Sequence, residues 1–150
     1  MIEPRQRILF TTVAALVVAI GVSLAVSASQ EASGRAALTA RAKAFLRSLK
    51  GLPEDGTPGR RVDPTEFLRP ADRGAARSLL ALERLQGAFG NANDDLLVAQ
   101  VKILGNGRAV TYSPVELDVP MGRHRVQAGL RELAWVQGPD GRWYLDPAGL

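Results

Sequence analysis

Few side chains in this chain could perform acid–base or nucleophilic chemistry. His124 is the only histidine in the 150 residues, and there is no cysteine. A multi-histidine metal site, a thiolate metal site and a cysteine nucleophile are therefore excluded. Paired carboxylates occur at Glu54-Asp55 and Asp94-Asp95, in loop or capping contexts with no histidine nearby. The sequence predicts no metal, no cofactor and no catalytic residue.

Aromatic side chains offer a different kind of chemistry, the binding of an apolar ligand. Two tryptophans lie on segments that we expect to be adjacent strands, where they either line a pocket or form core, and core is the commoner role. The candidate pocket residues are Tyr112, Leu130, Trp135 and Trp143. With four phenylalanines, two tyrosines and two tryptophans, the chain has too few aromatic residues for an interleaved basic and aromatic surface that binds nucleic acid.

An uncharged run over residues 8–28, ILFTTVAALVVAIGVSLAVSA, indicates a membrane segment. At about 1.5 Å per residue it is long enough to cross a hydrocarbon core roughly 30 Å thick. Its ending, Val26-Ser27-Ala28, also fits a signal-peptidase site. A cleaved signal usually carries an apolar region of about 7–15 residues, so the length of this run favours an uncleaved, single-pass anchor.

The charges that flank the run orient the predicted anchor in the cell membrane. Arg35, Arg41, Lys43 and Arg47 follow it, within the stretch that the positive-inside rule counts. Against them, residues 1–7 place two arginines directly at the membrane, and a long folded domain can be translocated largely regardless of its charge. We therefore expect a cytoplasmic tail over residues 1–7 and an extracytoplasmic domain after the anchor.

Composition limits the part of the chain after the anchor to one domain. The whole chain carries 19 basic and 15 acidic residues, a net charge of +4. About 120 residues remain after the anchor, which suits a single domain with a modest core. Because no disulfide can form without cysteine, we expect that core alone to hold the domain together.

The first part of this domain, residues 29–50, predicts an amphipathic helix. At 100° per residue, an apolar stripe falls within an arc of about 100°, and basic residues group on another side. The stripe consists of Leu38, Ala42, Phe45, Leu46 and Leu49, and the basic residues are Lys43, Arg47 and Lys50. We expect the stripe to pack on the domain and Gly51 to end the helix. The candidate partner-binding residues are Leu38, Phe45, Leu49 and Arg47.

Residues 51–62 predict a loop, because glycine, proline and charged residues dominate them. Asp63 and Pro64 then predict the cap and first position of a short helix that ends before Pro70. A longer helix is expected over residues 71–89. Its predicted inner stripe is Ala75, Leu79, Leu82 and Phe89.

After Asp95 the hydrophobic period changes from helical to two, which predicts strands over the rest of the domain. Asn106-Gly107 favours a two-residue hairpin turn that pairs Gly105 with Arg108. This pairing predicts that Val110 and Tyr112 share a face with Val101 and Ile103. A change of parity near Ser113-Pro114 predicts a β-bulge. Further strands are expected over residues 126–136 and 142–146, with a turn at 138–141.

The expected architecture is therefore α+β, with helices first and then a bent, four-stranded antiparallel meander, and residues 63–150 form the remainder of the single domain. The anchor 8–28, the helix 31–50, the strand LLVAQVKILGNGRAV at 96–110 and the ending GPDGRWYLD at 138–146 together resemble the nuclear-transport-factor-2-like superfamily. More narrowly, the chain resembles the mammalian-cell-entry-associated single-pass membrane proteins. It also resembles a bitopic subunit of type IV secretion machines.

The resemblance implies a bent sheet that wraps around helices as a cone, and a role in assembly. Some members of the superfamily are isomerases or dehydratases that use an Asp or His base with a Tyr donor. The positions that such chemistry would use are Tyr112, Asp118, His124, Tyr144 and Asp146, but the strand parity turns Asp118 outward. Many members also have an additional strand where this chain has the loop 51–62.

We therefore expect a non-enzymatic, membrane-anchored accessory subunit of a cell-envelope transport or secretion assembly. Such a subunit would act through contacts with other envelope proteins. The alternative is a small-molecule or lipid-binding module with a hydrophobic pocket.

Overall fold

The computed structural model describes residues 4–53, 59, 61–89, 98–118 and 125–149, without the side chains of residues 4–15, 17, 20, 21, 115–118 and 125–128. The chain divides into two compact units, Met1–Gly34 and Arg35–Leu150. The boundary between the two units falls inside one long helix.

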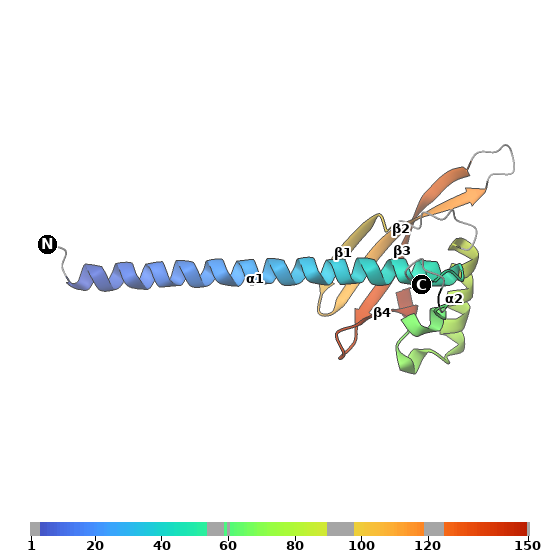
Figure 1. Cartoon of the computed structure of the whole chain (residues 1–150), viewed down its shortest axis with the longest axis horizontal. Helices are drawn as coiled ribbons and strands as arrows, with labels where there is room; N and C mark the ends of the chain where they lie inside the picture. Colours follow the sequence, from blue (N-terminus) through green and yellow to red (C-terminus); the bar gives the residue numbers. More distant parts are fainter. Residues whose placement is uncertain (1–3, 54–58, 60, 90–97, 119–124, 150) are drawn as a thin grey trace. The chain divides into compact units, whose positions relative to one another are not determined.

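This helix, α1, spans Pro4–Leu49 and begins in the first unit (Figure 1). A search of the described residues found no helix with the length and hydropathy needed to cross a membrane. The side chains of residues 8–15, 17, 20 and 21 lie outside the described set, so the anchor over residues 8–28 stays a prediction. Of the described apolar side chains in this unit, Leu16, Val18 and Leu24 are each more than 60% exposed.

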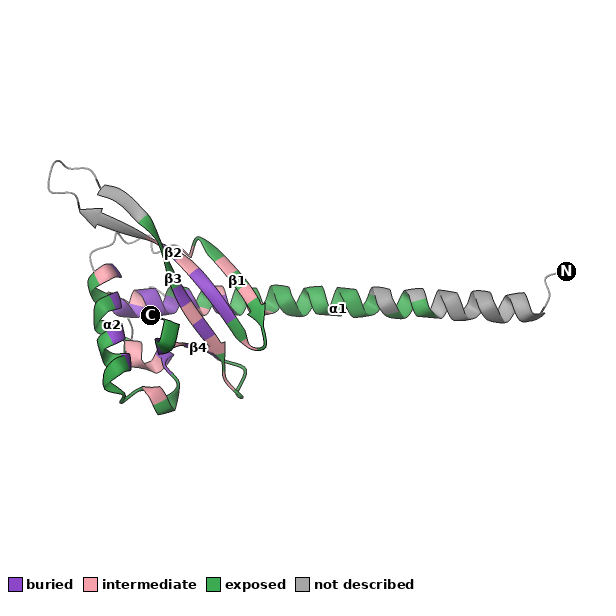
Figure 2. Cartoon of the chain, turned by 180° about the vertical axis from the view of Figure 1, so that it is seen from behind, coloured by how far each residue is buried: buried purple, intermediate pink, exposed green. Residues whose placement is uncertain are grey.

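The second unit is built around the last three turns of α1. The predicted apolar stripe, from Leu38 to Leu49, is fully or almost fully buried, as Figure 2 shows in purple. Ala44 and Ser48 are buried as well, so this part of the helix is covered on more sides than the amphipathic pattern predicts. Gly51 ends the helix as expected, with a φ of 66°. Its amide donates to the carbonyl of Ser48 at 2.9 Å, which is a glycine C-cap arrangement.

In the described part of the chain, α1 is followed by η1 (Pro64–Phe67), η2 (Pro70–Asp72) and α2 (Ala76–Phe89). The predicted cap is confirmed, because the Asp63 carboxylate accepts the amide of Thr65 at 2.8 Å. This bond lowers the pKa of Asp63. The continuous helix expected over residues 71–89 is instead split, and α2 begins only at Ala76.

The predicted inner stripe of α2 is wrong at two of its four positions. Ala75 precedes the helix, and Leu79 is 45% exposed. The side that packs inward has the spacing i, i+3, i+4, i+7 and i+11, a continuous row on one face. It consists of Ser78, Ala81, Leu82, Leu85 and Phe89. The sequence places leucines on both sides of the helix, and the structure buries the side whose row continues to Phe89.

The remaining elements form one antiparallel sheet of four strands in the order β1-β2-β3-β4 (Figure 1). These strands are β1 (Gln100–Gly105), β2 (Arg108–Asp118), β3 (Arg125–Gln137) and β4 (Trp143–Leu145). A short η3 (Pro147–Gly149) ends the described chain. The α+β class and the order of helices before a meander are confirmed.

The predicted turn at Asn106-Gly107 is present, but the prediction of which residues of the two strands share a face is wrong. Both residues have positive φ, as a type I′ turn requires, and Gly105 pairs with Arg108. The next pair along the ladder is Ile103 with Ala109, which leaves Leu104 as an extra residue. This bulge shifts the parity of β1, so that Val101 and Ile103 share a face with Ala109 and Thr111, and Val110 and Tyr112 lie on the other face.

A second bulge lies close to the one expected near Ser113-Pro114, but on the other strand. Val115 pairs with Gly129 and Glu116 pairs with Gln127, which makes Ala128 of β3 the extra residue. Gly129 has a φ of 138°, a conformation that favours glycine. Bulges increase the local twist, so both irregularities contribute to bending of this sheet.

The core joins α1, η1, α2 and one face of the sheet. The ring of Phe45 makes edge-on contacts with Phe67 at 5.3 Å and with Trp135 at 5.9 Å, measured between ring centroids. Trp135 donates from its indole Nε1 to the Thr111 hydroxyl at 2.9 Å, so its polar atom is satisfied inside the core. Leu133 of β3 and Leu145 of β4 complete this face.

Replacing Phe45 tests this packing. Phe45→Ala should lower the free energy of unfolding of the second unit by about 3–5 kcal/mol, because it removes a ring that contacts both η1 and β3. Urea denaturation followed by tryptophan fluorescence measures the change. Lys43→Ala, an exposed position on the same helix, should change it by no more than about 0.5 kcal/mol. Equal effects of the two substitutions would contradict this packing.

Replacing Gly105 tests the bulge. Gly105 has a φ of 88°, and no atom lies within 4 Å of the position that a Cβ would occupy there. Gly105→Ala should therefore destabilise the protein by about 1–2 kcal/mol through backbone strain alone. The Cβ added by Gly34→Ala would also have no atom within 4 Å, but Gly34 lies inside α1. This substitution should therefore stabilise the helix by about 0.5–1 kcal/mol. Thermal unfolding monitored by circular dichroism should show opposite shifts for the two variants, and a stabilising Gly105→Ala would rule out the bulge.

Candidate functional site

Three of the four residues predicted to contact a partner lie in the core of the chain itself. Leu38 and Phe45 are fully buried, and Leu49 is nearly so. Their contacts are with the elements of the second unit, so a partner does not reach them in this fold. The fourth, Arg47, is half-buried, and its Nε donates to the carbonyl of Pro53 at 2.7 Å. This bond ties the start of the loop 51–62 to the end of α1.

The four residues predicted to line one pocket are divided between the two faces of the sheet. Trp135 pairs with Leu145 and Gln137 with Trp143, which places both tryptophans on the face that packs against the helices. Tyr112 pairs with Glu132, and Leu130 lies two residues earlier on the same strand. These two residues therefore share the opposite face, where Leu130 is 55% exposed. The proposed set does not form one pocket, because Leu130 and Trp135 are an odd number of residues apart on β3 and therefore lie on opposite faces.

Arg41 has a central position that the sequence analysis missed. Its Nε donates to the carbonyl of Trp143 at 3.3 Å and its Nη2 to the carbonyl of Glu66 at 3.2 Å. Its guanidinium also lies 4.1 Å from the centroid of the Phe67 ring, a cation–π contact. One side chain thus joins α1 to β4 and to η1. The signal was present in the spacing, since Arg41 follows Leu38 by three residues and precedes Phe45 by four.

Two tyrosine–carboxylate pairs could in principle act in acid–base chemistry. Tyr144 donates from its hydroxyl to Oδ2 of Asp140 at 2.6 Å. This bond raises the pKa of Tyr144 and lowers the pKa of Asp140. A hydrogen bond to Glu132 likewise raises the pKa of Tyr112. Both tyrosines therefore stay protonated at neutral pH and act as hydrogen-bond donors, and neither is poised as a base.

Asp146 is one of the other positions suggested by the resemblance. Asp146 is half-buried, and its Oδ1 accepts the amide of Ala148 at 3.1 Å, which stabilises the turn before η3. His124 and the side chain of Asp118 lie outside the described residues. In the part of the chain that the structure describes, no three His, Asp or Glu side chains gather into a possible metal site.

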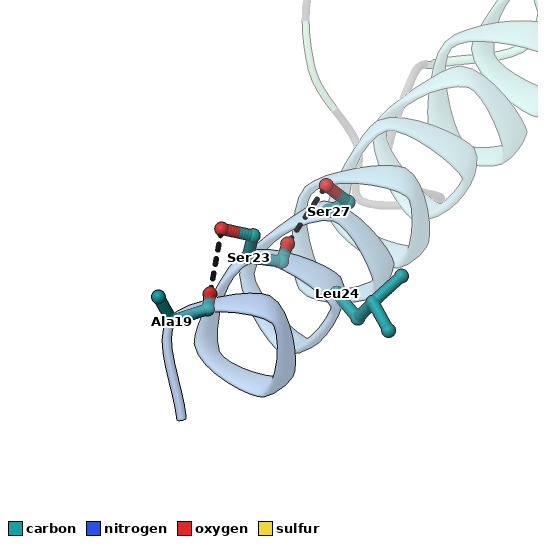
Figure 3. A pocket seen from close by; sticks show the side chains of 4 residues that line it. All are labelled: Ala19, Ser23, Leu24 and Ser27. Carbon is teal, nitrogen blue, oxygen red and sulfur yellow. Dashed lines mark hydrogen bonds between the residues drawn. The ribbon is translucent and has the colours of Figure 1, made fainter. Parts of the chain in front are cut away.

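A shallow depression on α1 is lined by Ala19, Ser23, Leu24 and Ser27 (Figure 3). The hydroxyl of Ser23 donates to the carbonyl of Ala19, and that of Ser27 to the carbonyl of Ser23, both at 2.9 Å. Each serine therefore satisfies its hydrogen bond within the helix itself, the usual arrangement for serine in an apolar helix. The depression presents methyl and methylene groups rather than free donors.

Comparisons with known proteins gave no relationship. No protein-family model matches the sequence, and neither the curated proteins nor the solved structures include one that is significantly similar.

The Tyr144–Asp140 bond predicts a specific pH dependence of stability. Tyr144→Phe should destabilise the protein at pH 7, where Asp140 is ionised and Tyr144 is protonated. Because the folded-state pKa of Asp140 is lowered, the bond's contribution is lost as pH falls through a value below 3.8. Because the folded-state pKa of Tyr144 is raised, the contribution is also lost as pH rises through a value above 10.0.

Denaturation of the parent and of Tyr144→Phe at a series of pH values measures this difference. The difference in the free energy of unfolding should be largest between the folded-state pKa values of Asp140 and Tyr144, and it should vanish below the first and above the second. A difference that does not vary with pH would mean that lost packing, rather than the hydrogen bond, is responsible.

Proposed function

We propose that this protein is a non-enzymatic, membrane-anchored accessory subunit of a cell-envelope transport or secretion assembly, and that it acts through contacts with other proteins. The observation that carries the proposal is the set of exposed apolar side chains on successive turns of α1. Leu16, Val18, Val22, Leu24 and Val26 are each at least half exposed. Such a concentration of apolar surface on consecutive helical turns is unfavourable in water and requires a cover.

A lipid bilayer is the cover that this segment fits. The uncharged run extends from residue 8 to residue 28, a length that spans a hydrocarbon core. The serines within it bond to their own helix, which removes the cost of placing their hydroxyls in lipid. The proposed orientation has residues 1–7 in the cytoplasm and the domain outside it.

The domain's polar groups favour binding over catalysis. Tyr144, Asp140 and Asp146 are engaged in bonds that hold turns, and Tyr112 bonds to Glu132 across neighbouring strands. The proposed fold family is the nuclear-transport-factor-2-like superfamily, with a sheet bent into a cone. Two bulges in a four-stranded antiparallel sheet, packed on helices, support that proposal.

Purification from the native membrane tests the proposed function. Full-length protein extracted in mild detergent should bring with it a defined membrane complex, identified by mass spectrometry. The matched control is a form that begins at Ser29 and is exported with a cleavable signal, which should leave the membrane fraction. If the full-length protein is recovered alone, or if both forms fractionate as free monomers, the proposal is wrong.

The orientation has a separate test. Alkaline phosphatase fused after Leu150 should be active in intact cells, because this enzyme requires an oxidising, extracytoplasmic compartment to form its disulfides. An inactive but stable fusion would place the domain in the cytoplasm and contradict the orientation.

A further inference from the structure

The outward face of α2 combines charge and exposed apolar surface in a regular row. Arg77, Leu80 and Arg84 follow one another at spacings of three and four, so they cover an arc of about 60° on the helix. All three are exposed, Leu80 to 48%, and Leu79, the preceding residue in the sequence, is 45% exposed. Figure 2 shows this side of α2 in green, away from the purple residues that pack inward.

Among the described residues, the two arginines of this row make no hydrogen bond or ion pair through their side chains. Upstream, Arg69 bonds to Asp72 at 2.7 Å, and Arg73 donates to the carbonyl of Leu68 at 3.3 Å. Among the interactions of the described residues, none involves the guanidinium of Arg77 or Arg84. Within that part of the chain, the row therefore presents two unpaired positive charges with a leucine between them.

We propose that this face of α2 is a docking site for an acidic amphipathic helix of another protein. A helix that carries acidic side chains on either side of an apolar residue complements Arg77, Leu80 and Arg84 in both charge and spacing. Gly87 continues the same face, and nothing lies within 4 Å of the position that its Cβ would occupy. A partner backbone can therefore approach closely at that end.

Charge argues against the two other occupants of such a face. A second copy of this chain would bring arginines against arginines, which is repulsive. A helix that lies on a lipid surface has a broad apolar face with basic residues at its margins. Here the large exposed apolar side chains are only Leu79 and Leu80, too few for a broad apolar face, and the acidic Glu83 is exposed on the same side of the helix. An acidic protein segment fits this arrangement better than an anionic membrane does.

This inference rests on the proposed function and names the chemistry of the partner that such a subunit would bind. The probe is a synthetic acidic helical peptide with glutamates on either side of a leucine at the spacing of the row, compared with its lysine counterpart. Full-length protein carrying Gln86→Cys, the only cysteine in the chain, is labelled with a fluorophore and held in nanodiscs. Titration measures the dissociation constant.

The acidic peptide should bind, and raising the salt concentration from about 50 to about 500 mM should weaken binding at least tenfold. The lysine peptide should not bind. The double variant Arg77→Glu, Arg84→Glu should weaken binding at least tenfold with an unchanged circular dichroism spectrum. The control Lys102→Glu, Arg108→Glu makes the same change of charge at exposed positions on the sheet, and should alter binding less than twofold.

Three results would overturn the inference. The first is no binding of the acidic peptide, and the second is an equal loss of affinity in the two double variants. The third is a shift in fluorophore emission that requires the two arginines and appears when the nanodisc lipid is changed from phosphatidylcholine to phosphatidylglycerol. The first two leave no specific site, and the third assigns the face to lipid. If the peptide does not bind but the chain still purifies within a membrane complex, the docking face alone is wrong. If the peptide binds but the chain purifies alone, the proposed function is wrong.

Discussion

The second unit depends on the burial of one helical stripe, from Leu38 to Leu49, against a single face of a small sheet. Without disulfides, this hydrophobic contact is the main source of stability for a domain of this size. Phe45 lies at its centre, where it contacts Phe67 of η1 and Trp135 of β3. The helix that is proposed to enter the membrane therefore also supplies the core of the domain.

Polar groups at the edge of this core determine how the elements meet. Arg41 binds two carbonyls and the face of an aromatic ring, which fixes α1 relative to β4 and η1. The bond from Trp135 to Thr111 requires both side chains to lie on the inner face of the sheet. Tyr112 and Tyr144 lie on the other face, because each alternates along its strand with residues of the inner face.

Much of the fold could be predicted from the sequence because strong local signals specify it. The stripe of α1, the cap at Asp63, the glycine stop at Gly51 and the hairpin turn are all present. The candidate pocket failed because Leu130 and Trp135, five residues apart on β3, lie on opposite faces. The bulge at Leu104, which no pattern in the sequence marks, is the reason why Tyr112 does not share the face of Val101 and Ile103. Partner residues failed for another reason: an apolar stripe has the same appearance whether a partner or the chain itself covers it.

Hydrogen–deuterium exchange on the full-length protein in detergent tests the central role of α1 most directly. Amides of residues 38–49 should exchange only by global unfolding of the second unit, at the same rate as the inner strands β2 and β3. Mass spectrometry after proteolysis can compare these segments within one sample. Rapid exchange of residues 38–49 while β2 and β3 remain protected would show that the sheet is stable without this helix, and would contradict the central role of α1.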